Sequence, residues 1–313
     1  MSSVGIEILA YSELKQKNAL LPLMEQAFGW PFDPTEFEKS IKVDPRLRNG
    51  SVGFCALKEG KVVGYAGVMD FTLRTVSGAE EKVGGLYGVA TYPGYTRQGI
   101  CTSIMNRSHE YFRAKGYRFS LLITSPTIVA HILYRKLGYF DVASFLSAYL
   151  GVRAKRMKAL ERRSVSKLDY DRMLELFREY VKGRTGFVIR DKEYLRMLVK
   201  KYEISANDCI VTEKGYVIFK KEKQSVRIRE LVAHDSSEMN RLIGLVENKT
   251  PKAVVGGLGI PNCAVSRAYA SRGFTVLETG HIVLMAKELI ADASFNDCFG
   301  SGFYMSALDG SVI

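Results

Sequence analysis

The segment 88–102 places the tightest constraint on how this chain folds. Residues 81–91 are predicted to form a strand, and Pro93 helps to end its pairing because proline cannot donate a hydrogen bond to a neighbouring strand. Residues 99–115 have the apolar spacing of a helix, with Gly116 at the position after its last turn. The segment therefore predicts a strand that passes through a short loop directly into a helix.

The loop before this helix is suited to holding an anion. The first N–H groups of a helix have no partner within it and carry partial positive charge, so they can bind a phosphate or pyrophosphate. Gly99 allows a phosphate to approach the backbone without a Cβ in the way, and Arg97 adds charge-assisted donors. Taken alone the pattern is weak, because many strand–loop–helix units contain one glycine.

The rest of the first half alternates between the two kinds of element, which predicts a mixed α/β fold. Asp33 is predicted to cap a helix that starts at Pro34. Extended segments are predicted over residues 6–10, 51–57, 62–73, 119–124 and 139–150, and helices over 14–28, 34–41 and 128–137.

The second half runs through a similar order of elements, which indicates a degenerate tandem duplication. A basic stretch over 153–163 suits a connector, so the predicted domains are 1–152 and 153–313. Helices are predicted over 170–181, 191–202, 236–247 and 263–271, and strands over 164–168, 209–213, 216–220, 225–233, 253–257 and 275–284. The segment 292–313 receives no assignment.

Composition excludes several classes of protein. The chain has 313 residues, of which 47% are hydrophobic and 25% charged, an ordinary globular balance. It has no apolar run of about 18 residues and no secretory signal pattern, so we expect no membrane association and a cytoplasmic location. The five cysteines are odd in number, widely spaced and without a CxxC pair, and the four histidines lack ligand spacing, so we expect no disulfide framework and no metal.

The net charge of +12 can attract a polyanion such as nucleic acid or the phosphates of a cofactor. The stretch 153–163 is the candidate contact for nucleic acid, but it lacks interleaved aromatic residues that stack on bases. A solvated basic surface without a specific partner is the favoured interpretation.

The segment 96–101 resembles the central motif of the GNAT superfamily of N-acetyltransferases, which reads Gln or Arg, two free positions, Gly, one free position, then Gly or Ala. Thr96 and Cys101 depart from that motif, and Gly99 matches it. Residues 89–93 are similar to the strand-to-loop pattern of the family. A second landmark lies at 127–139, which resembles the family's helix Asn-x-x-Ala-x-x-Leu-Tyr-x-Lys-Leu-Gly-Phe, with Thr127 in place of Asn.

The resemblance implies an α/β (α+β) fold with a mixed central sheet flanked by helices, acetyl-CoA as cosubstrate, and a primary amine as acceptor in a ternary complex. Backbone N–H groups of Val89 and Thr91 would bind the acyl carbonyl and the pantetheine arm. Tyr134 would protonate the departing thiolate as general acid. The implied cofactor-binding residues are Val89, Ala90, Thr91, Arg97, Gln98, Gly99, Ile100, Cys101, Thr102 and Thr127.

Each of these roles has a structural alternative. Tyr134 without the resemblance is a packing aromatic on an amphipathic helix, and Cys101 more simply fits beside the phosphate than acts as a nucleophile. For the general base, Glu80 and Glu81 start the strand that ends at the acetyl site, but solvated hairpin charges are favoured. His131 lies one turn before Tyr134 and is assigned an orienting or structural role.

The second half has no phosphate loop. Residues 231–238 lack the glycine and carry two acids, Asp235 and Glu238, which would repel a phosphate, and Asp235 or Ser236 is a predicted helix cap. Residues 268–274 resemble a degenerate Leu-Gly-Phe landmark. One active and one inactive GNAT domain resemble the Eis (enhanced intracellular survival)-like acetyltransferases, without a counterpart of their sterol-carrier-like third domain. In that family the terminal carboxylate acts as base, a role that is not assigned to Ile313.

A different class of function stays open from the sequence. The departures at Thr96 and Thr127, with the basic second half, are compatible with a non-catalytic module that responds to CoA or associates with nucleic acid. Aminoacyl transfer by a tandem GNAT is a further option within the enzyme class. The sequence does not indicate the acceptor or the oligomeric state.

Overall fold

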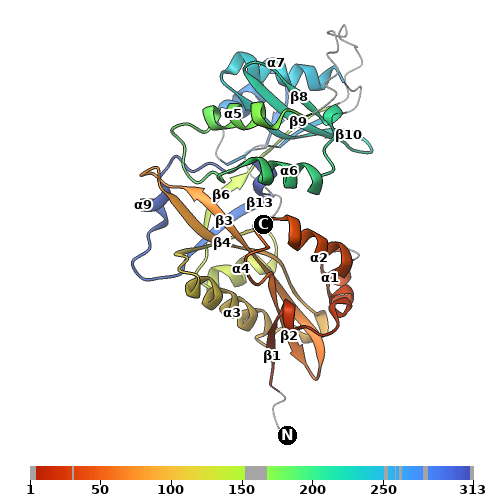
Figure 1. The fold of residues 1–313 in the computed structure, drawn as a ribbon. Coiled ribbons are helices and arrows are strands. Elements are labelled where there is room, and N and C mark those ends of the chain that lie inside the picture. The colour runs from red at the N-terminus through yellow and green to blue at the C-terminus, as the bar shows by residue number, and fades with distance from the viewer. Residues whose placement is uncertain are drawn as a thin grey trace.

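The computed structural model describes residues 5–29, 32–151, 168–249, 253–257, 259–260, 263–277 and 281–310. It contains two mixed sheets, each flanked by helices, one built mainly from the first half of the chain and one mainly from the second (Figure 1). The α/β class that the sequence predicts is confirmed.

Within the described residues, the first sheet has seven strands, and β4 and β5 form its only parallel pair. The other neighbours in this sheet are antiparallel. In spatial order the strands are β1 (Glu7–Ala10), β2 (Gly53–Lys58), β3 (Lys61–Arg74), β4 (Glu80–Thr91), β5 (Phe119–Thr124), β13 (Ile282–Glu288) and β6 (Phe140–Phe145).

The second sheet has six strands and again a single parallel pair, β10 with β11. Its strands in spatial order are β12 (Thr275–Val276), β7 (Ser147–Leu150), β11 (Ala253–Gly257), β10 (Ser225–Ala233), β9 (Gly215–Lys221) and β8 (Cys209–Val211). The repeated order of elements in the sequence thus corresponds to two sheets of related pairing.

The two halves exchange strands. Strand β13, from near the C-terminus, lies between β5 and β6 in the first sheet, while β7, from the first half, lies between β12 and β11 in the second. The strands predicted over 275–284 therefore belong to different sheets. The domain limits 1–152 and 153–313 stay a prediction about chain order, because each sheet includes a strand from the other half.

Three helices of the first half agree with the sequence except at their ends, and the fourth does not. Asp33 caps α2, as predicted, by accepting the N–H of Thr35 at 2.8 Å. The single helix predicted over 14–28 is wrong: short 3₁₀ turns cover Lys17–Leu20 and the preceding Tyr11–Glu13, and α1 begins only at Leu21. Pro22 explains the late start, because proline lacks the N–H that a helix interior needs and is tolerated in the first turn. The helices are α1 (Leu21–Phe28), α2 (Pro34–Val43), α3 (Ile100–Ala114) and α4 (Val129–Lys136).

The second half and the C-terminal segment supply the remaining described helices. A 3₁₀ turn over Ala206–Asp208 precedes β8. The C-terminal segment, which received no assignment from the sequence, contains two short helices. These helices are α5 (Tyr170–Tyr180), α6 (Lys192–Lys201), α7 (Ser236–Glu247), α8 (Cys263–Ser271), α9 (Phe295–Phe299) and α10 (Ala307–Gly310).

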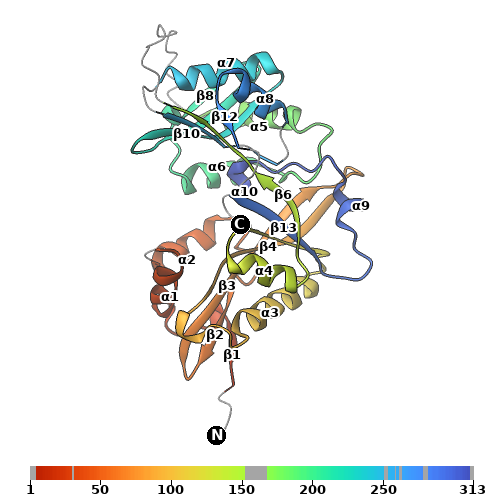
Figure 2. The ribbon, with the colours of Figure 1, turned by 180° about the vertical axis from the view of Figure 1, so that it is seen from behind.

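The two faces of the first sheet have different partners. Helices α3 and α4 pack on one face, where their apolar residues join those of β2 to β5 and β13 in one core cluster (Figure 2). The other face packs on α1 and shares a continuous core with the second half, in which Met69 and Phe71 of β3 join Tyr194 and Met197 of α6. The residues of the candidate site lie on the side of α3 and α4.

Candidate functional site

The parallel strands β4 and β5 separate before either of them ends. They pair only from Gly84 to Leu86 on β4, so residues 87–91 have no described strand on that side. On its other edge, β4 carries one extra residue relative to β3, because Tyr87 and Ala90 pair with Gly67 and Tyr65. Gly88 takes a φ of +58° within this bulge. The bulge bends β4 away from β5 and leaves backbone groups of its end free for a ligand.

The loop after β4 leads into a helix that no side chain caps. Arg97 has a φ of +60° and Gly99 a φ of +78°, and α3 begins at Ile100 without any side chain that caps it. The helical hydrogen bonds start with the N–H of Ser103, which donates to Gly99 at 2.9 Å, so the preceding N–H groups are available. By contrast, aspartates cap the helices α2, α5, α6 and α7 (Asp33, Asp169, Asp191 and Asp235).

This loop carries one exposed basic side chain, Arg97, and a second, Lys58, reaches it from β2. Gln98 accepts a hydrogen bond from Lys58 Nζ at 2.9 Å, and Lys58 also lies 5.7 Å from the ring of Tyr95. A Cβ on Gly99 would meet no atom within 4 Å, so the space before the helix is open. Lys58 is a basic residue that the sequence motif does not include, because it comes from the β2–β3 hairpin.

Tyr134 lies in the core beneath this loop. Its side chain is 6% exposed, and burial raises the pKa of its phenol above the ordinary value, followed by a smaller contribution from the Cys101 thiol. No described residue forms a hydrogen bond with its hydroxyl group. The hydroxyl oxygen is also not fully enclosed by the protein. The phenol is therefore protonated at neutral pH and has a hydroxyl free to donate.

Cys101 connects Tyr134 to the end of β4. Burial raises the pKa of its thiol to about 11, and the neighbouring Thr91 hydroxyl only partly offsets this. The Thr91 hydroxyl is itself enclosed and has no well-formed hydrogen bond. Residues from β4, α3 and α4 are thus brought to one place, and a thiol with this pKa is neutral at pH 7 rather than a ready nucleophile.

Thr127 lies in the exposed turn before α4. Its hydroxyl is 2.9 Å from that of Ser125, and its N–H donates to the same Ser125 oxygen at 3.4 Å. The threonine hydroxyl is thus engaged within the turn. The following residues Ile128 and Val129 are exposed apolar side chains at the start of α4.

The acids considered as general base lie away from this place. Glu81 forms an ion pair with Arg118 at 2.5 Å, and Glu80 lies 3.7 Å from Arg74. Glu81 precedes Thr91 by ten residues of strand, which is roughly 33 Å at about 3.3 Å per residue. Glu80 thus pairs within the β3–β4 hairpin, and Glu81 pairs with the residue just before β5.

His131 has a partner that explains its position. Its Nε2 lies 2.8 Å from an Asp141 oxygen, and Arg135 approaches the same carboxylate at 3.8 Å. These contacts join α4 to β6, which agrees with an orienting or structural role for His131.

Behind Tyr134 lies a buried polar group that sequence reasoning missed. The Tyr139 hydroxyl is 2.9 Å from His109 Nε2 and 2.7 Å from Ser120 Oγ, and its ring meets that of Tyr134 edge-on at 6.1 Å. Burial and the nearby charges of Lys287 and Arg113 lower the pKa of His109 to about 3, so its ring is neutral. Only the aromatic residue of the second landmark gave a signal for this group.

In the second half, the gap beside β10 that corresponds to the open edge of β4 is filled. Asp235 caps α7 by accepting the N–H of Glu238 at 2.8 Å, as predicted. Pairing of β10 with β11 ends at Ile228, and the chain of the C-terminal segment lies in the gap, with Ile260 donating to Met305 at 2.8 Å. The space that remains there is about 10 Å³.

The remaining predictions concern the connector, the last residue, metal binding and membrane-spanning helices. The basic stretch 153–163 and Ile313 lie outside the described residues. In the part of the chain that the structure describes, no three His, Cys, Asp or Glu side chains form a possible metal site. The longest described helix, α3, has 15 residues, and none of the described helices has the length and apolar character that a bilayer crossing requires.

Comparison with known proteins finds relatives of the first half. A family model described as an acetyltransferase (GNAT) domain matches residues 11–141. An uncharacterized N-acetyltransferase of Streptomyces coelicolor is 25% identical over 210 residues, which cover 61% of this chain and 48% of that protein. The chain therefore spans about half the length of this curated relative.

Solved structures extend the likeness to both halves. A GCN5-related N-acetyltransferase from Kribbella flavida has a TM-score of 0.68 at 20% identity, covering 91% of this chain and 72% of that one. Eis1 from Mycobacterium abscessus has a TM-score of 0.56 at 16% identity, covering 91% and 74%. Residues 11–141 thus match the model of an acetyltransferase (GNAT) domain, and the chain shares the fold of both solved structures.

Proposed function

We propose that this protein transfers an acetyl group from acetyl-CoA to a primary amine, by direct attack within a ternary complex. One observation carries the proposal: the unpaired end of β4, the uncapped start of α3 and the hydroxyl side of Tyr134 converge on one place. The family of the domain makes acetyl-CoA the expected donor.

The binding half of the proposal rests on backbone groups. The pantetheine arm would pair with Val89 and Thr91 as an added strand, where β5 no longer pairs with β4. The pyrophosphate would lie on the N–H groups at the start of α3, between Arg97 and Thr102, where Gly99 leaves open space. Thr127 would contribute from the turn before α4.

The chemical half concerns the movement of one proton. The amine nitrogen attacks the thioester carbonyl, the C–S bond breaks, and the sulfur leaves as a thiolate that must gain a proton. Tyr134 is suited to supply it, because burial keeps the phenol protonated and its hydroxyl has no described partner. The attacking amine must lose its own proton first, and no described residue is assigned to take it.

Calorimetric titration with acetyl-CoA, followed by a thiol-release assay over a panel of amines, tests this function. We expect saturable binding at one site and CoA release that depends on an added amine. Saturable binding without CoA release in the presence of any amine would favour the non-catalytic CoA-responsive module. The absence of binding would exclude both the enzyme and the CoA-responsive module.

Replacing Gly99 with alanine is expected to weaken acetyl-CoA binding about tenfold or more, because the new Cβ would point into the space where a phosphate would lie and disturb charge-assisted hydrogen bonds. Gly116→Ala is the matched control. It lies at the other end of α3 with a φ of +77°, against +78° for Gly99, and both positions have open space around an added Cβ. Equal losses in both variants would mean that backbone strain alone is responsible.

Replacing Cys101 with alanine is expected to preserve turnover. A covalent acyl-cysteine mechanism would instead require the thiol, so its removal would abolish transfer. Steady-state kinetics at pH 7 to 9 check this, together with alkylation by iodoacetamide, which should be slow because the thiol pKa is about 11. A loss of turnover on the order of 10²-fold or more would contradict direct attack.

A further inference from the structure

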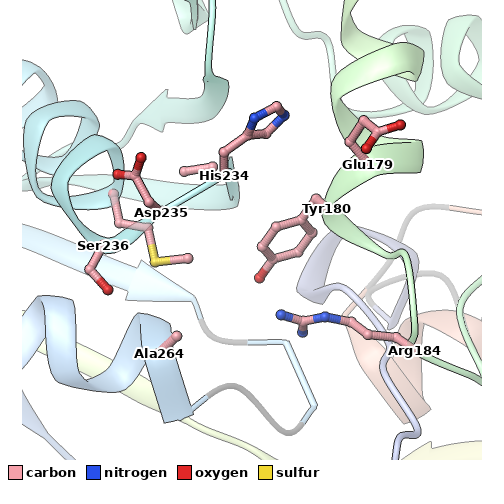
Figure 3. A pocket seen from close by; sticks show the side chains of 9 residues that line it. Glu179, Tyr180, Arg184, His234, Asp235, Ser236 and Ala264 are labelled. Atoms are coloured by element: carbon pink, nitrogen blue, oxygen red, sulfur yellow. The ribbon is translucent and has the colours of Figure 1, made fainter.

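The second half contains a cavity of about 360 Å³ that lies apart from the candidate acetyl-CoA site. It is formed by the end of α5 and the loop after it, the end of β10, the start of α7 and the start of α8 (Figure 3). All of its lining residues come from positions 179–264, so none belongs to β4, α3 or α4. Its volume lies within the range of about 300–1,000 Å³ that small-molecule sites occupy.

One side of the cavity carries an anchored cation. The Arg184 guanidinium lies 4.5 Å from the ring centre of Tyr180 and 5.0 Å from that of Tyr304, so two aromatic rings hold it in place. Figure 3 shows Arg184 and Tyr180 pointing toward the middle of the cavity. No carboxylate of the described residues forms an ion pair with Arg184. The cation is therefore positioned but has no described counter-charge.

The facing side carries acid. Asp235 and Ser236 lie at the start of α7, across the cavity from Arg184 (Figure 3). One Asp235 oxygen accepts the N–H of Glu238. Glu179, a second lining acid, belongs to α5 and lies on the same side as Arg184 (Figure 3). Neither acid forms an ion pair within the described part of the chain. Opposite charges thus line one cavity without contacting each other.

We propose that this cavity binds a small zwitterion of the amino-acid class. Its carboxylate would bind the Arg184 guanidinium, and its ammonium group would lie toward Asp235. A simple anion would be repelled by Asp235 and Glu179, and a simple amine by Arg184, whereas a molecule with both charges pairs with each side. The site is independent of the proposed acetyl transfer.

Titration calorimetry of the full chain with L-leucine and L-glutamine tests the proposal. Two further probes carry one charge each: isocaproate is L-leucine without its amine, and isoamylamine is L-leucine without its carboxylate. We expect saturable binding of at least one amino acid. If L-leucine binds, isocaproate should bind at least about tenfold more weakly, because one charged contact is lost. Absence of saturable binding for both amino acids, or isocaproate binding as tight as that of L-leucine, overturns the proposal.

Variants assign the binding to this cavity rather than to the acceptor side of the acetyltransferase domain. Arg184→Gln should weaken amino-acid binding about tenfold or more, while Arg178→Gln, an exposed arginine of α5 outside the lining, should leave it unchanged. Asp235→Asn removes the facing charge but retains a good helix cap, so it should fold and also bind more weakly. Unchanged affinity in a folded Arg184→Gln or Asp235→Asn variant overturns the proposal.

Discussion

Replacing Tyr134 with phenylalanine is expected to lower the turnover of acetyl transfer about 10²–10⁴-fold while leaving the affinity for acetyl-CoA nearly intact. The change removes only the hydroxyl, and the buried ring keeps its edge-on contact with Tyr139. The proton for the departing thiolate must then come from water. Steady-state kinetics across pH, with calorimetry for the cofactor, separate the two effects.

The second half supplies a matched control for this variant. Tyr269 precedes Gly273 and Phe274 by the same spacing as Tyr134 precedes Gly138 and Tyr139. In both helices the aromatic residue after the glycine donates its N–H to the carbonyl of that tyrosine, at 3.0 and 3.1 Å.

Tyr269→Phe should therefore leave turnover unchanged. The Tyr269 hydroxyl is fully enclosed and has no hydrogen-bond partner among the described residues, so its removal also costs little stability. Wild-type turnover in Tyr134→Phe over the whole pH range would exclude the general-acid role. Equal losses in the two variants would point to packing instead.

Replacing Arg190 with methionine is expected to lower the free energy of unfolding by about 3–5 kcal/mol, the typical cost of removing one partner from a buried ion pair. Arg190 is bound on one side to Glu230 at 2.7 Å and on the other to Asp309 at 2.6 Å, and these side chains are each 1% exposed. Without the guanidinium, two carboxylates stay buried next to each other. Urea unfolding of the variant and of the exposed-arginine control Arg178→Met measures the difference.

The loss of stability in Arg190→Met is expected to depend on pH. In the wild type, Arg190 holds the pKa of Glu230 below its ordinary value despite burial, while burial raises that of Asp309. In Arg190→Met both carboxyl groups would have raised pKa values, so the native state would bind more protons than the unfolded state and lose stability as pH rises. The deficit against wild type should therefore be smaller at pH 5 than at pH 8. A deficit that grows on acidification would contradict this account.

The same ion-pair group fixes the C-terminal segment. Ser306 and Asp309 both accept from Arg190, and Tyr194 donates to Asp309 at 3.1 Å. One residue further, a Cβ on Gly310 would lie 2.5 Å from Phe145 and 3.2 Å from Ile123, so the segment returns to β6 and β5 of the first sheet. Adding Glu230→Gln and Asp309→Asn to Arg190→Met should recover part of the lost stability, because none of the three charges of this group would remain buried.

The local units of this protein can be predicted from its amino-acid sequence. The strand–loop–helix segment, the glycines at 99, 116 and 138 and the aspartate caps of α2 and α7 follow from backbone preferences and short-range hydrogen bonds, which neighbouring residues decide. The two landmarks of the resemblance lie on such units, and the family match to residues 11–141 agrees with them. The single helix predicted over 14–28 is wrong for a local reason as well, because Pro22 is tolerated only in the first turn of a helix and α1 therefore begins at Leu21.

How these units meet depends on contacts between residues far apart in the sequence. Residues 119–124 pair with Ile282–Glu288, a separation of more than 150 positions that no local pattern predicts, and this pairing places β13 in the first sheet. Long-range packing likewise brings Cys101 to Tyr134, places His109 and Ser120 on Tyr139, and fills the gap beside β10 with the C-terminal segment. Such contacts depend on which surfaces bury each other, and periodicity along one segment carries no information about its partner.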